Sequence, residues 1–160
     1  MIAADLLEIA RSKGVMITTA ESCTGGLIAV AITEIPGSSA MFDRGFVTYS
    51  NDAKTEMLGV PFTLITDHGA VSQPVAEAMA QGALSRSKAG IAISVTGVAG
   101  PGGTPEKPEG MVCFGIATAD GVQSETQQFG AIGRARVRAK TVDHALLLCI
   151  KALTKLTSDK

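Results

Sequence analysis

Segments with helical periodicity alternate with short apolar segments through the first two thirds of this chain, and a hairpin pattern follows them. The expected helices cover about residues 2–13, 24–35, 51–58, 73–87 and 134–156, and the expected strands cover about residues 15–19, 46–49, 91–95, 111–118 and 122–129. Strands that alternate with helices tend to pair in parallel, whereas an Asp-Gly turn joins the last two strands antiparallel. We therefore expect an α/β fold, a three-layer α/β/α sandwich with a mixed sheet.

The composition favours one domain and argues against nucleic acid as a partner. A chain of 160 residues with 46% hydrophobic side chains can bury one core and is short for two, so a single domain over residues 1–160 is expected. A net charge of −1 gives no general attraction to a phosphate backbone, and one tyrosine without tryptophan offers few surfaces on which bases could stack. No membrane is expected either, since no segment reaches the roughly 18 apolar residues of a membrane span.

The cysteines indicate a reducing compartment and no metal site. Cys23, Cys113 and Cys149 are odd in number and share no C-x-x-C spacing, which argues against a disulfide framework or a zinc site. Asp5 and Glu8 interrupt the first apolar residues, so the N-terminus resembles an amphipathic helix more than a signal peptide. The expected location is the cytoplasm.

The run Glu21-Ser22-Cys23-Thr24-Gly25-Gly26 lies where an expected strand passes into an expected helix. It places a hydroxyl and a thiol beside backbone N–H groups, where a nucleophile is useful and an anion can bind. A helix N-terminus lowers the pKa of a thiol, so Cys23 is a credible nucleophile, whereas Ser22 needs a separate base. In a purely structural interpretation, Ser22 or Thr24 caps the helix. The residues alone leave these alternatives open.

Lys54 is the leading candidate for a base that would activate a serine. It falls in the first turn of the helix that follows Ser50, where the positive helix end disfavours an ammonium group, and burial would lower its pKa further. Tyr49 could relay a proton or donate to an oxyanion, or could be a half-buried strand aromatic. The histidines are weaker candidates, because His68 resembles a turn residue and His144 a surface or packing residue.

Two further groups could hold an anionic part of a ligand. The glycine-rich loop from Thr96 to Gly103 follows an expected strand and offers backbone N–H groups, although it matches neither a P-loop nor a dinucleotide fingerprint. Arg134 and Arg138 share one face at the start of the last expected helix, where cations are electrostatically misplaced. A surface loop and a solvated charged face are the structural alternatives. The proline-rich part in which the loop continues, about residues 104–109, and the last few residues of the chain are the candidates for disorder.

Four strings of this sequence closely resemble the CinA C-terminal domain family, and the match runs from about Leu6 to Leu153. The strings are Thr19-Ala20-Glu21-Ser22-Cys23-Thr24-Gly25-Gly26, Gly45-Phe46-Val47-Thr48-Tyr49-Ser50-Asn51 with Lys54, Gly69-Ala70-Val71-Ser72, and Thr96-Gly97-Val98-Ala99-Gly100-Pro101-Gly102-Gly103 with Gly110. The family's characterised enzymes are nicotinamide-nucleotide amidases, which deamidate nicotinamide mononucleotide to nicotinic acid mononucleotide and ammonia. The resemblance implies the fold of this family, that activity and substrate in pyridine nucleotide salvage, and neither a metal nor another cofactor.

The resemblance also assigns roles to individual residues. It implies that Ser22, Tyr49 and Lys54 carry out catalysis by a Ser/Lys acyl-enzyme mechanism, and that an arginine early in the last helix, here Arg138, belongs to the site. The turn before that helix, residues 131–133, departs from the usual Gly-Asp-Arg pattern. The residues expected to contact the substrate are Cys23, Thr24, Gly25, Gly26, Thr96, Gly97, Gly100, Gly102 and Arg134.

Within this assignment the two ends of the substrate have separate binding groups. Backbone N–H groups of residues 23–26 are expected to stabilise the oxyanion. The loop of residues 97–103, with Arg134 or Arg138, is expected to hold the phosphate. The alternative function is a non-catalytic nucleotide-binding or regulatory domain of the same fold. The alanine-rich composition also favours a homo-oligomer.

Overall fold

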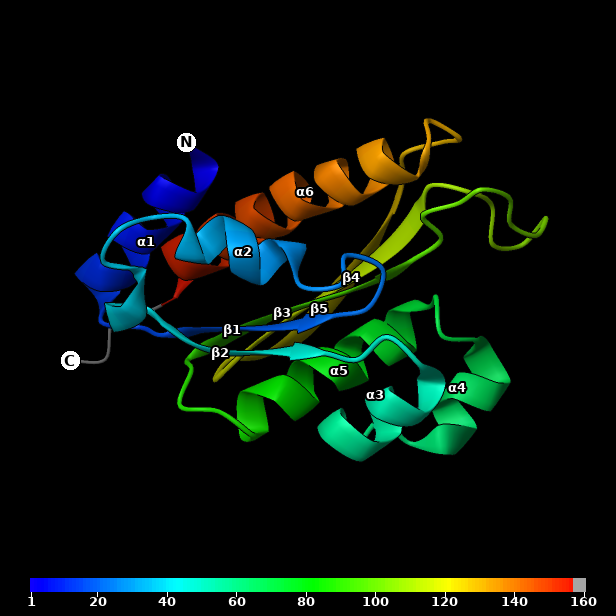
Figure 1. Cartoon of the computed structure of the whole chain (residues 1–160). Helices are drawn as coiled ribbons and strands as arrows, with labels where there is room; N and C mark the ends of the chain where they lie inside the picture. The colour runs from blue at the N-terminus through cyan, green and yellow to red at the C-terminus, as the bar shows by residue number, and fades with distance from the viewer. Residues whose placement is uncertain (157–160) are drawn as a thin grey trace.

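The computed structural model describes residues 1–156 and shows a five-stranded sheet between two layers of helices (Figure 1). The strands are β1 (Ile17–Glu21), β2 (Phe42–Val47), β3 (Ile91–Gly97), β4 (Met111–Thr118) and β5 (Gly121–Gln128). The helices are α1 (Ile2–Lys13), α2 (Leu27–Thr33), α3 (Asn51–Leu58), α4 (Phe62–His68), α5 (Gln73–Ser85) and α6 (Arg134–Lys155), with a short 3-10 turn, η1 (Ser38–Ala40), before β2. The predicted α/β/α sandwich is confirmed.

The sheet is mixed, as predicted, with the strand order β2-β1-β3-β4-β5. β1 pairs in parallel with both neighbours, so that Glu21 lies opposite Val47 on one side and Val95 on the other. β3, β4 and β5 pair antiparallel. Because the carboxyl ends of parallel strands meet at one edge of a sheet, the segments that follow β1, β2 and β3 converge there. These segments contain the Ser22 run, Tyr49 and the glycine-rich loop.

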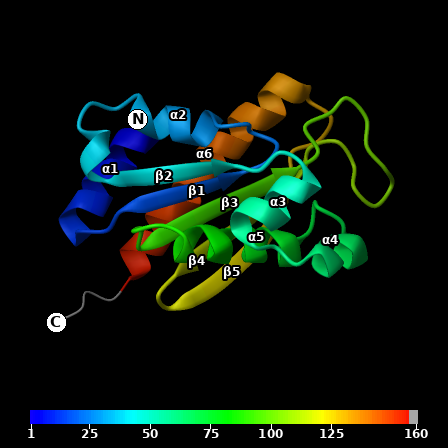
Figure 2. The ribbon, with the colours of Figure 1, turned by 60° about the horizontal axis from the view of Figure 1, so that its bottom comes forward.

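The two faces of the sheet bury different side chains. α1, α2 and α6 cover one face, and α3, α4 and α5 cover the other (Figures 1 and 2). Alternate residues of β3 point to opposite faces, so Ile91 and Ile93 join the core with α1 and α6, whereas Ala92 joins the core with α5. Residues from α3 and α6 can therefore reach the carboxyl edge of the sheet from opposite sides.

Several element boundaries predicted from the sequence are wrong. β2 ends at Val47 and Tyr49 lies beyond it, because pairing with β1, and not aromatic content, sets the ends of this strand. α2 begins at Leu27, since Gly25 and Gly26 adopt left-handed φ angles of 58° and 108° that a helix excludes. β1 also lies slightly later in the chain than expected.

One helix has no counterpart among the predicted elements. α4 has only 7 residues and no side-chain cap at its start, so its sequence carries little periodic signal. His68 is the last residue of this helix and not a turn residue. The caps that the sequence does announce are confirmed: Ser50 accepts the Ala53 N–H, and Ser72 caps α5.

The proline-rich part of the glycine-rich loop, which the sequence suggested could be disordered, has a defined turn. The Lys107 N–H donates to Thr104 Oγ1 at 3.0 Å, and the Thr104 N–H donates to the Lys107 carbonyl at 2.9 Å. The Lys107 ammonium group also donates to the Val71 carbonyl, which joins the loop to the segment before α5. The last residues of the chain, for which disorder was also considered, lie outside the described residues.

None of the helices within residues 1–156 combines the length and the apolar character needed to cross a membrane. In the same range, no group of three or more His, Cys, Asp or Glu side chains is arranged to hold a metal ion.

Candidate active site

The Ser22 run forms the turn between β1 and α2 at the carboxyl edge of the sheet. The Ser22 N–H donates to the Val95 carbonyl of β3 at 3.1 Å, which ties the start of the turn to the neighbouring strand. The Gly25 N–H donates to the Ser22 carbonyl, and the Leu27 N–H to the Thr24 carbonyl, both at 3.1 Å. The turn is therefore tightly hydrogen-bonded on both sides of the Ser22 side chain.

Glu21, the last residue of β1, accepts the N–H groups at the start of α2. Its Oε1 accepts from the Ile28 N–H at 2.9 Å and from Thr24 Oγ1 at 2.5 Å, and its Oε2 accepts from the Ala29 N–H at 3.1 Å. Neither Ser22 nor Thr24 caps α2, so the structural interpretation of this run is wrong. The Ser22 hydroxyl is left free to make other contacts.

Lys54 extends from α3 and contacts Ser22. Its Nζ donates to Ser22 Oγ at 2.8 Å and to the carbonyl oxygens of Thr48 and Tyr49 at 3.0 and 3.3 Å. Lys54 is only 1% exposed, and this burial lowers its pKa because it disfavours the charged ammonium form. A buried lysine with a lowered pKa, in contact with a hydroxyl, is what general-base activation of a serine requires.

Cys23 has the opposite character from the one expected at a helix N-terminus. The side chain is 6% exposed, and burial raises the pKa of its thiol to about 11. A thiol with this pKa stays protonated near neutral pH and is a poor nucleophile. The local chemistry therefore favours Ser22 over Cys23, a choice that the residues alone left open.

Tyr49 contributes its backbone, and not its hydroxyl, to the contact between Ser22 and Lys54. The Tyr49 carbonyl lies 3.5 Å from Ser22 Oγ, while the side chain is 61% exposed and so is not a half-buried strand aromatic. Its hydroxyl accepts from Arg134 Nη2 at 2.9 Å. The hydroxyl therefore lies at the rim of the site, and this geometry offers no support for a proton relay through it.

Two arginines of α6, Arg134 and Arg138, have different environments. Arg138 is half-buried, and its Nε and Nη2 donate to the carbonyl oxygens of Cys23 and Thr24, each at 3.1 Å. Arg134 is exposed, and its Nη1 donates to the Gly100 carbonyl at 2.8 Å. Arg138 thus holds the turn after Ser22, whereas Arg134 joins the glycine-rich loop to Tyr49 at the rim.

Replacing Arg138 with methionine is expected to lower the free energy of unfolding by about 2 kcal/mol, because two hydrogen bonds from a charged donor are lost. The turn that carries Ser22 should loosen, so kcat for a reaction at the Ser22 hydroxyl should fall by about 10- to 100-fold. Thermal unfolding and steady-state kinetics provide the two measurements. The control is Arg136→Met, an exposed neighbour on the same helix, which should change stability by less than about 0.5 kcal/mol. Equal effects of the two substitutions would contradict this role of Arg138.

The backbone N–H groups of Cys23 and Thr24, like that of Gly26, donate to no other residue within residues 1–156. In a trans peptide the N–H points opposite to the preceding carbonyl. The carbonyl before the Cys23 N–H accepts from Gly25, and the carbonyl before the Thr24 N–H accepts from Arg138. These bonds fix the direction of both N–H groups, and a donor pair directly after a candidate nucleophile suits an oxyanion.

The glycine-rich loop approaches the site only at its beginning. Thr96 Oγ1 donates to the Ala70 carbonyl at 2.9 Å, which joins the end of β3 to the segment before α5. Farther along, the loop is organised around Glu109: its Oε1 accepts from the Gly102 N–H at 3.2 Å and leaves no room for a side chain at Gly100. The predicted anion cradle at Gly100 and Gly102 has no support from this arrangement.

A cavity of about 220 Å³ lies over Ser22 and Lys54. Its lining residues are Ser22, Cys23, Tyr49, Asn51, Lys54, Ala70, Val71, Thr96, Gly97, Ala99 and Arg134. Seven of the predicted site residues are therefore brought together, whereas the remaining six do not line this cavity: Thr24, Gly25, Gly26, Gly100, Gly102 and Arg138. The cavity is also lined by Asn51, Ala70, Val71 and Ala99, for which the sequence alone predicts no role in a site. All four lie within the strings that resemble the family.

Neither described histidine lines this cavity. His68 ends α4, and His144 lies 3.1 Å from Glu125 beside the rings of Phe114 and Phe129. His144 is thus a packing residue between α6 and β5, as the sequence suggested. Among residues 1–156, Lys54 is the group in contact with Ser22 that could accept its proton.

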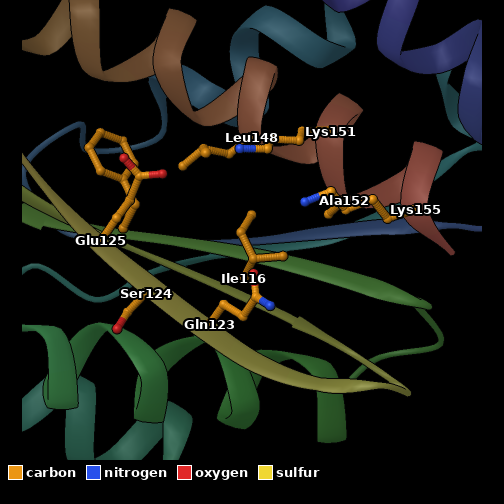
Figure 3. A pocket seen from close by; sticks show the side chains of 9 residues that line it. Ile116, Gln123, Ser124, Glu125, Leu148, Lys151, Ala152 and Lys155 are labelled. Atoms are coloured by element: carbon orange, nitrogen blue, oxygen red, sulfur yellow. The ribbon is translucent and has the colours of Figure 1, made fainter.

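Other cavities lack a comparable nucleophile. One of about 100 Å³ lies between α6 and the strands β4 and β5, with Lys151 reaching it from α6 and Glu125 from β5 (Figure 3). Ser124 supplies the one hydroxyl among its lining residues, but this side chain points toward α5 and donates to Glu77 at 2.9 Å. A larger one of about 680 Å³, among α3, α4 and α5, contains none of the predicted site residues. Of these three cavities, the Ser22 cavity is the one that holds a hydroxyl in contact with a buried lysine.

Comparison with known proteins places these features in a family context. The sequence model of the CinA C-terminal domain matches residues 1–153. The chain is 50% identical over 137 residues to the nicotinamide-nucleotide amidohydrolase PncC of Escherichia coli K12, covering 85% of this chain and 83% of that protein. It is 53% identical over 143 residues to a CinA-like protein of Mycolicibacterium gilvum, covering 88% of this chain and 34% of that protein. The chain spans only 25% to 35% of the longer curated relatives it matches.

Solved structures share the whole fold. The competence/damage inducible protein CihA of Agrobacterium tumefaciens superposes with a TM-score of 0.92 at 50% identity, covering 96% of this chain and 94% of that chain. The competence damage-inducible protein A of Klebsiella pneumoniae superposes with a TM-score of 0.93 at 33% identity, covering 98% of this chain and 97% of that chain. The arrangement of sheet and helices described above is therefore common to these proteins.

Proposed function

This chain belongs to the CinA C-terminal domain family, and from that premise we propose that it is an amidase that hydrolyses nicotinamide mononucleotide to nicotinic acid mononucleotide and ammonia. The observation that carries the proposal is the 2.8 Å contact between Lys54 Nζ and Ser22 Oγ beside the cavity. The similarity to the E. coli amidohydrolase over most of both chains supports the choice of substrate. Pyridine nucleotide salvage is the process that this reaction would serve.

In the first half of the proposed reaction, Ser22 Oγ attacks the carboxamide carbon while neutral Lys54 accepts the hydroxyl proton. The bond from this carbon to the amide nitrogen then breaks. The Lys54 ammonium group returns the proton to the departing nitrogen, which leaves as ammonia. The acyl group remains as an ester on Ser22. The lowered pKa of Lys54 supports this role, because a lysine must be neutral before it can accept a proton.

In the second half, water hydrolyses the ester. Lys54 accepts a proton from the attacking water and delivers it to Ser22 Oγ as the C–O bond of the ester breaks. The carboxylic acid is released and the serine is restored. In both halves the Cys23 and Thr24 N–H groups would hold the oxyanion, a contribution of about 3 kcal/mol per donor in comparable enzymes.

Arg134 is the proposed anchor for the substrate phosphate. It lines the cavity and is exposed at its rim, as a group that meets a phosphate from solvent must be. Arg138, the other candidate, is engaged with the Cys23 and Thr24 carbonyls and lies outside the cavity lining. Guanidinium groups suit phosphate because they donate two parallel hydrogen bonds. Thr96 and Gly97 form the cavity wall contributed by β3.

Ammonia release from nicotinamide mononucleotide tests this function directly. The purified chain should release ammonia from the mononucleotide, and kcat/KM for free nicotinamide should be at least about 100-fold lower, because the remote phosphate helps to orient the amide. Equal turnover of the two compounds would contradict a phosphate anchor. Tight binding of the mononucleotide without ammonia release would contradict the amidase and support the alternative, a nucleotide-binding domain.

A further inference from the structure

Glu21 lies at the junction of the two halves of the site. It is the last residue of β1, directly before Ser22, and is only 1% exposed. Each of its side-chain oxygens accepts at least one hydrogen bond from the segment after Ser22: Thr24 and Ile28 donate to Oε1, and Ala29 donates to Oε2. The side chain thus binds the far end of the nucleophile turn.

The backbone of Glu21 connects to the base. Its carbonyl accepts the Thr48 N–H at 2.8 Å and lies 3.4 Å from Thr48 Oγ1. The Thr48 carbonyl in turn accepts from Lys54 Nζ at 3.0 Å. One residue therefore contacts both the turn that carries the nucleophile and the segment that holds the lysine.

We propose that Glu21 is a positioning residue that sets the contact between Ser22 Oγ and Lys54 Nζ, an inference that deepens the proposed function and rests on it. Its carboxyl group holds the turn from the α2 side, while Arg138 holds the Cys23 and Thr24 carbonyls from α6. Because hydrogen bonds hold the turn on both sides, the Ser22 hydroxyl faces Lys54 in one orientation.

Capping of α2 alone does not account for this arrangement. The N-cap residue is Gly26, which has no side chain to accept N–H groups and whose left-handed φ of 108° would strain any other residue. Glu21 instead reaches forward from the strand and also binds the Thr24 hydroxyl inside the turn. Unlike an ordinary helix cap, Glu21 makes hydrogen bonds both to the residues that follow Ser22 and to Thr48 in the segment that holds Lys54.

Glu21→Gln is the variant that tests the proposal. A glutamine amide has one acceptor oxygen and a donor NH₂ group, so it cannot accept from both Ile28 and Ala29 in the same geometry. We expect kcat for nicotinamide mononucleotide to fall by about 10- to 100-fold with KM nearly unchanged. The matched control is Glu34→Gln, the same change at an exposed glutamate just after α2, which should leave kcat unchanged.

A substrate-independent readout separates positioning from a loss of fold. The rate at which a fluorophosphonate labels Ser22, measured by mass spectrometry, should fall in Glu21→Gln at equal amounts of folded protein, as counted by far-UV circular dichroism. Thr24→Val, which removes one donor and keeps the carboxyl group, should show a smaller fall in both labelling rate and kcat. This second variant provides the test if Glu21→Gln does not fold.

The outcomes separate this inference from the proposed function. If the wild type releases ammonia and Glu21→Gln keeps the same kcat and labelling rate, the positioning role is overturned and the amidase stands. Where only Thr24→Val folds, the same result in that variant leads to the same conclusion. Slower labelling of the variant, in a protein whose wild type releases no ammonia, would support the positioning role while refuting the amidase. A labelling rate that falls only in proportion to the folded fraction would overturn the role of Glu21 as well.

Discussion

Replacing Lys54 with methionine is expected to lower kcat for ammonia release by about 10,000-fold or more. Methionine keeps most of the apolar stem but removes the nitrogen that contacts Ser22 Oγ at 2.8 Å, so the hydroxyl loses its proton acceptor. No histidine among the described residues lines the cavity to take over. Ammonia release should be followed at high enzyme concentration, with thermal unfolding to verify the fold.

The pH dependence of the wild-type rate should report the same group. Because burial lowers the pKa of Lys54, the rate should rise with pH as this lysine loses its proton, and then level off above that pKa. Lys54 should also make the free energy of unfolding rise with pH from its lowered pKa up to about 9, because in that interval the unfolded chain binds the proton that the folded chain does not. Above 9 the buried Cys23, Cys113 and Cys149, whose pKa values burial raises, act in the opposite direction. Both effects of Lys54 should be absent from Lys54→Met.

Lys151→Met is the control for this prediction. It is the same substitution at an exposed lysine of α6, outside the Ser22 cavity, and should leave both the rate and its pH profile unchanged. Substantial activity in Lys54→Met, or a variant profile that keeps the acid limb, would show that another group acts as the base.

Ser22→Ala and Cys23→Ala should have very different effects. Loss of the Ser22 hydroxyl removes the nucleophile, and kcat is expected to fall by about 10,000-fold or more. Loss of the Cys23 thiol keeps both the serine and the Cys23 N–H group, so kcat should stay within about tenfold of wild type. The reason for this contrast is burial, which raises the pKa of the thiol to about 11 and keeps it protonated. Steady-state kinetics of the two variants provides the measurement.

Stability measurements on both variants show whether a loss of activity reflects a loss of folded protein. Cys23 belongs to the hydrophobic core, and shortening it to alanine should lower the free energy of unfolding by about 1 kcal/mol. Ser22→Ala should unfold near the wild-type temperature. Near-normal ammonia release by Ser22→Ala together with its loss in Cys23→Ala would reverse the assignment of the nucleophile.

The sequence predicted the layered fold and the sheet type because both follow from periodic patterns and turn residues. Ser50 before α3 and the Asp-Gly turn between β4 and β5 are local signals, and the elements that they delimit are confirmed. Tyr49 was placed in a strand on its β propensity, but the end of β2 depends on pairing with β1, which is a tertiary property. The family resemblance, carried by four strings, is confirmed by the match over residues 1–153.

The site shows the same division between local and tertiary signals. The position of Lys54 in a capped helix predicts it as the candidate base, and the structure places it in contact with Ser22. The choice between Ser22 and Cys23 depends on which of them contacts Lys54 and on the raised pKa of the buried thiol, and no local pattern reveals either. Arg138 was expected to belong to the site, and it or Arg134 was expected to hold the phosphate, whereas the partners of Arg138 in the structure are carbonyl groups 115 and 114 positions earlier in the chain. The contacts of Glu21 were missed, because a carboxylate that ends a strand carries no signal of this kind.

Trapping the acyl-enzyme tests the central claim most directly. Wild-type protein mixed with nicotinamide mononucleotide and quenched in acid during turnover should carry the acyl group as an ester, and peptide fragmentation should place it on Ser22. The same adduct should be missing from Ser22→Ala. An adduct on Cys23, or rapid ammonia release through a pathway in which Ser22 is never acylated, would contradict the Ser22–Lys54 mechanism.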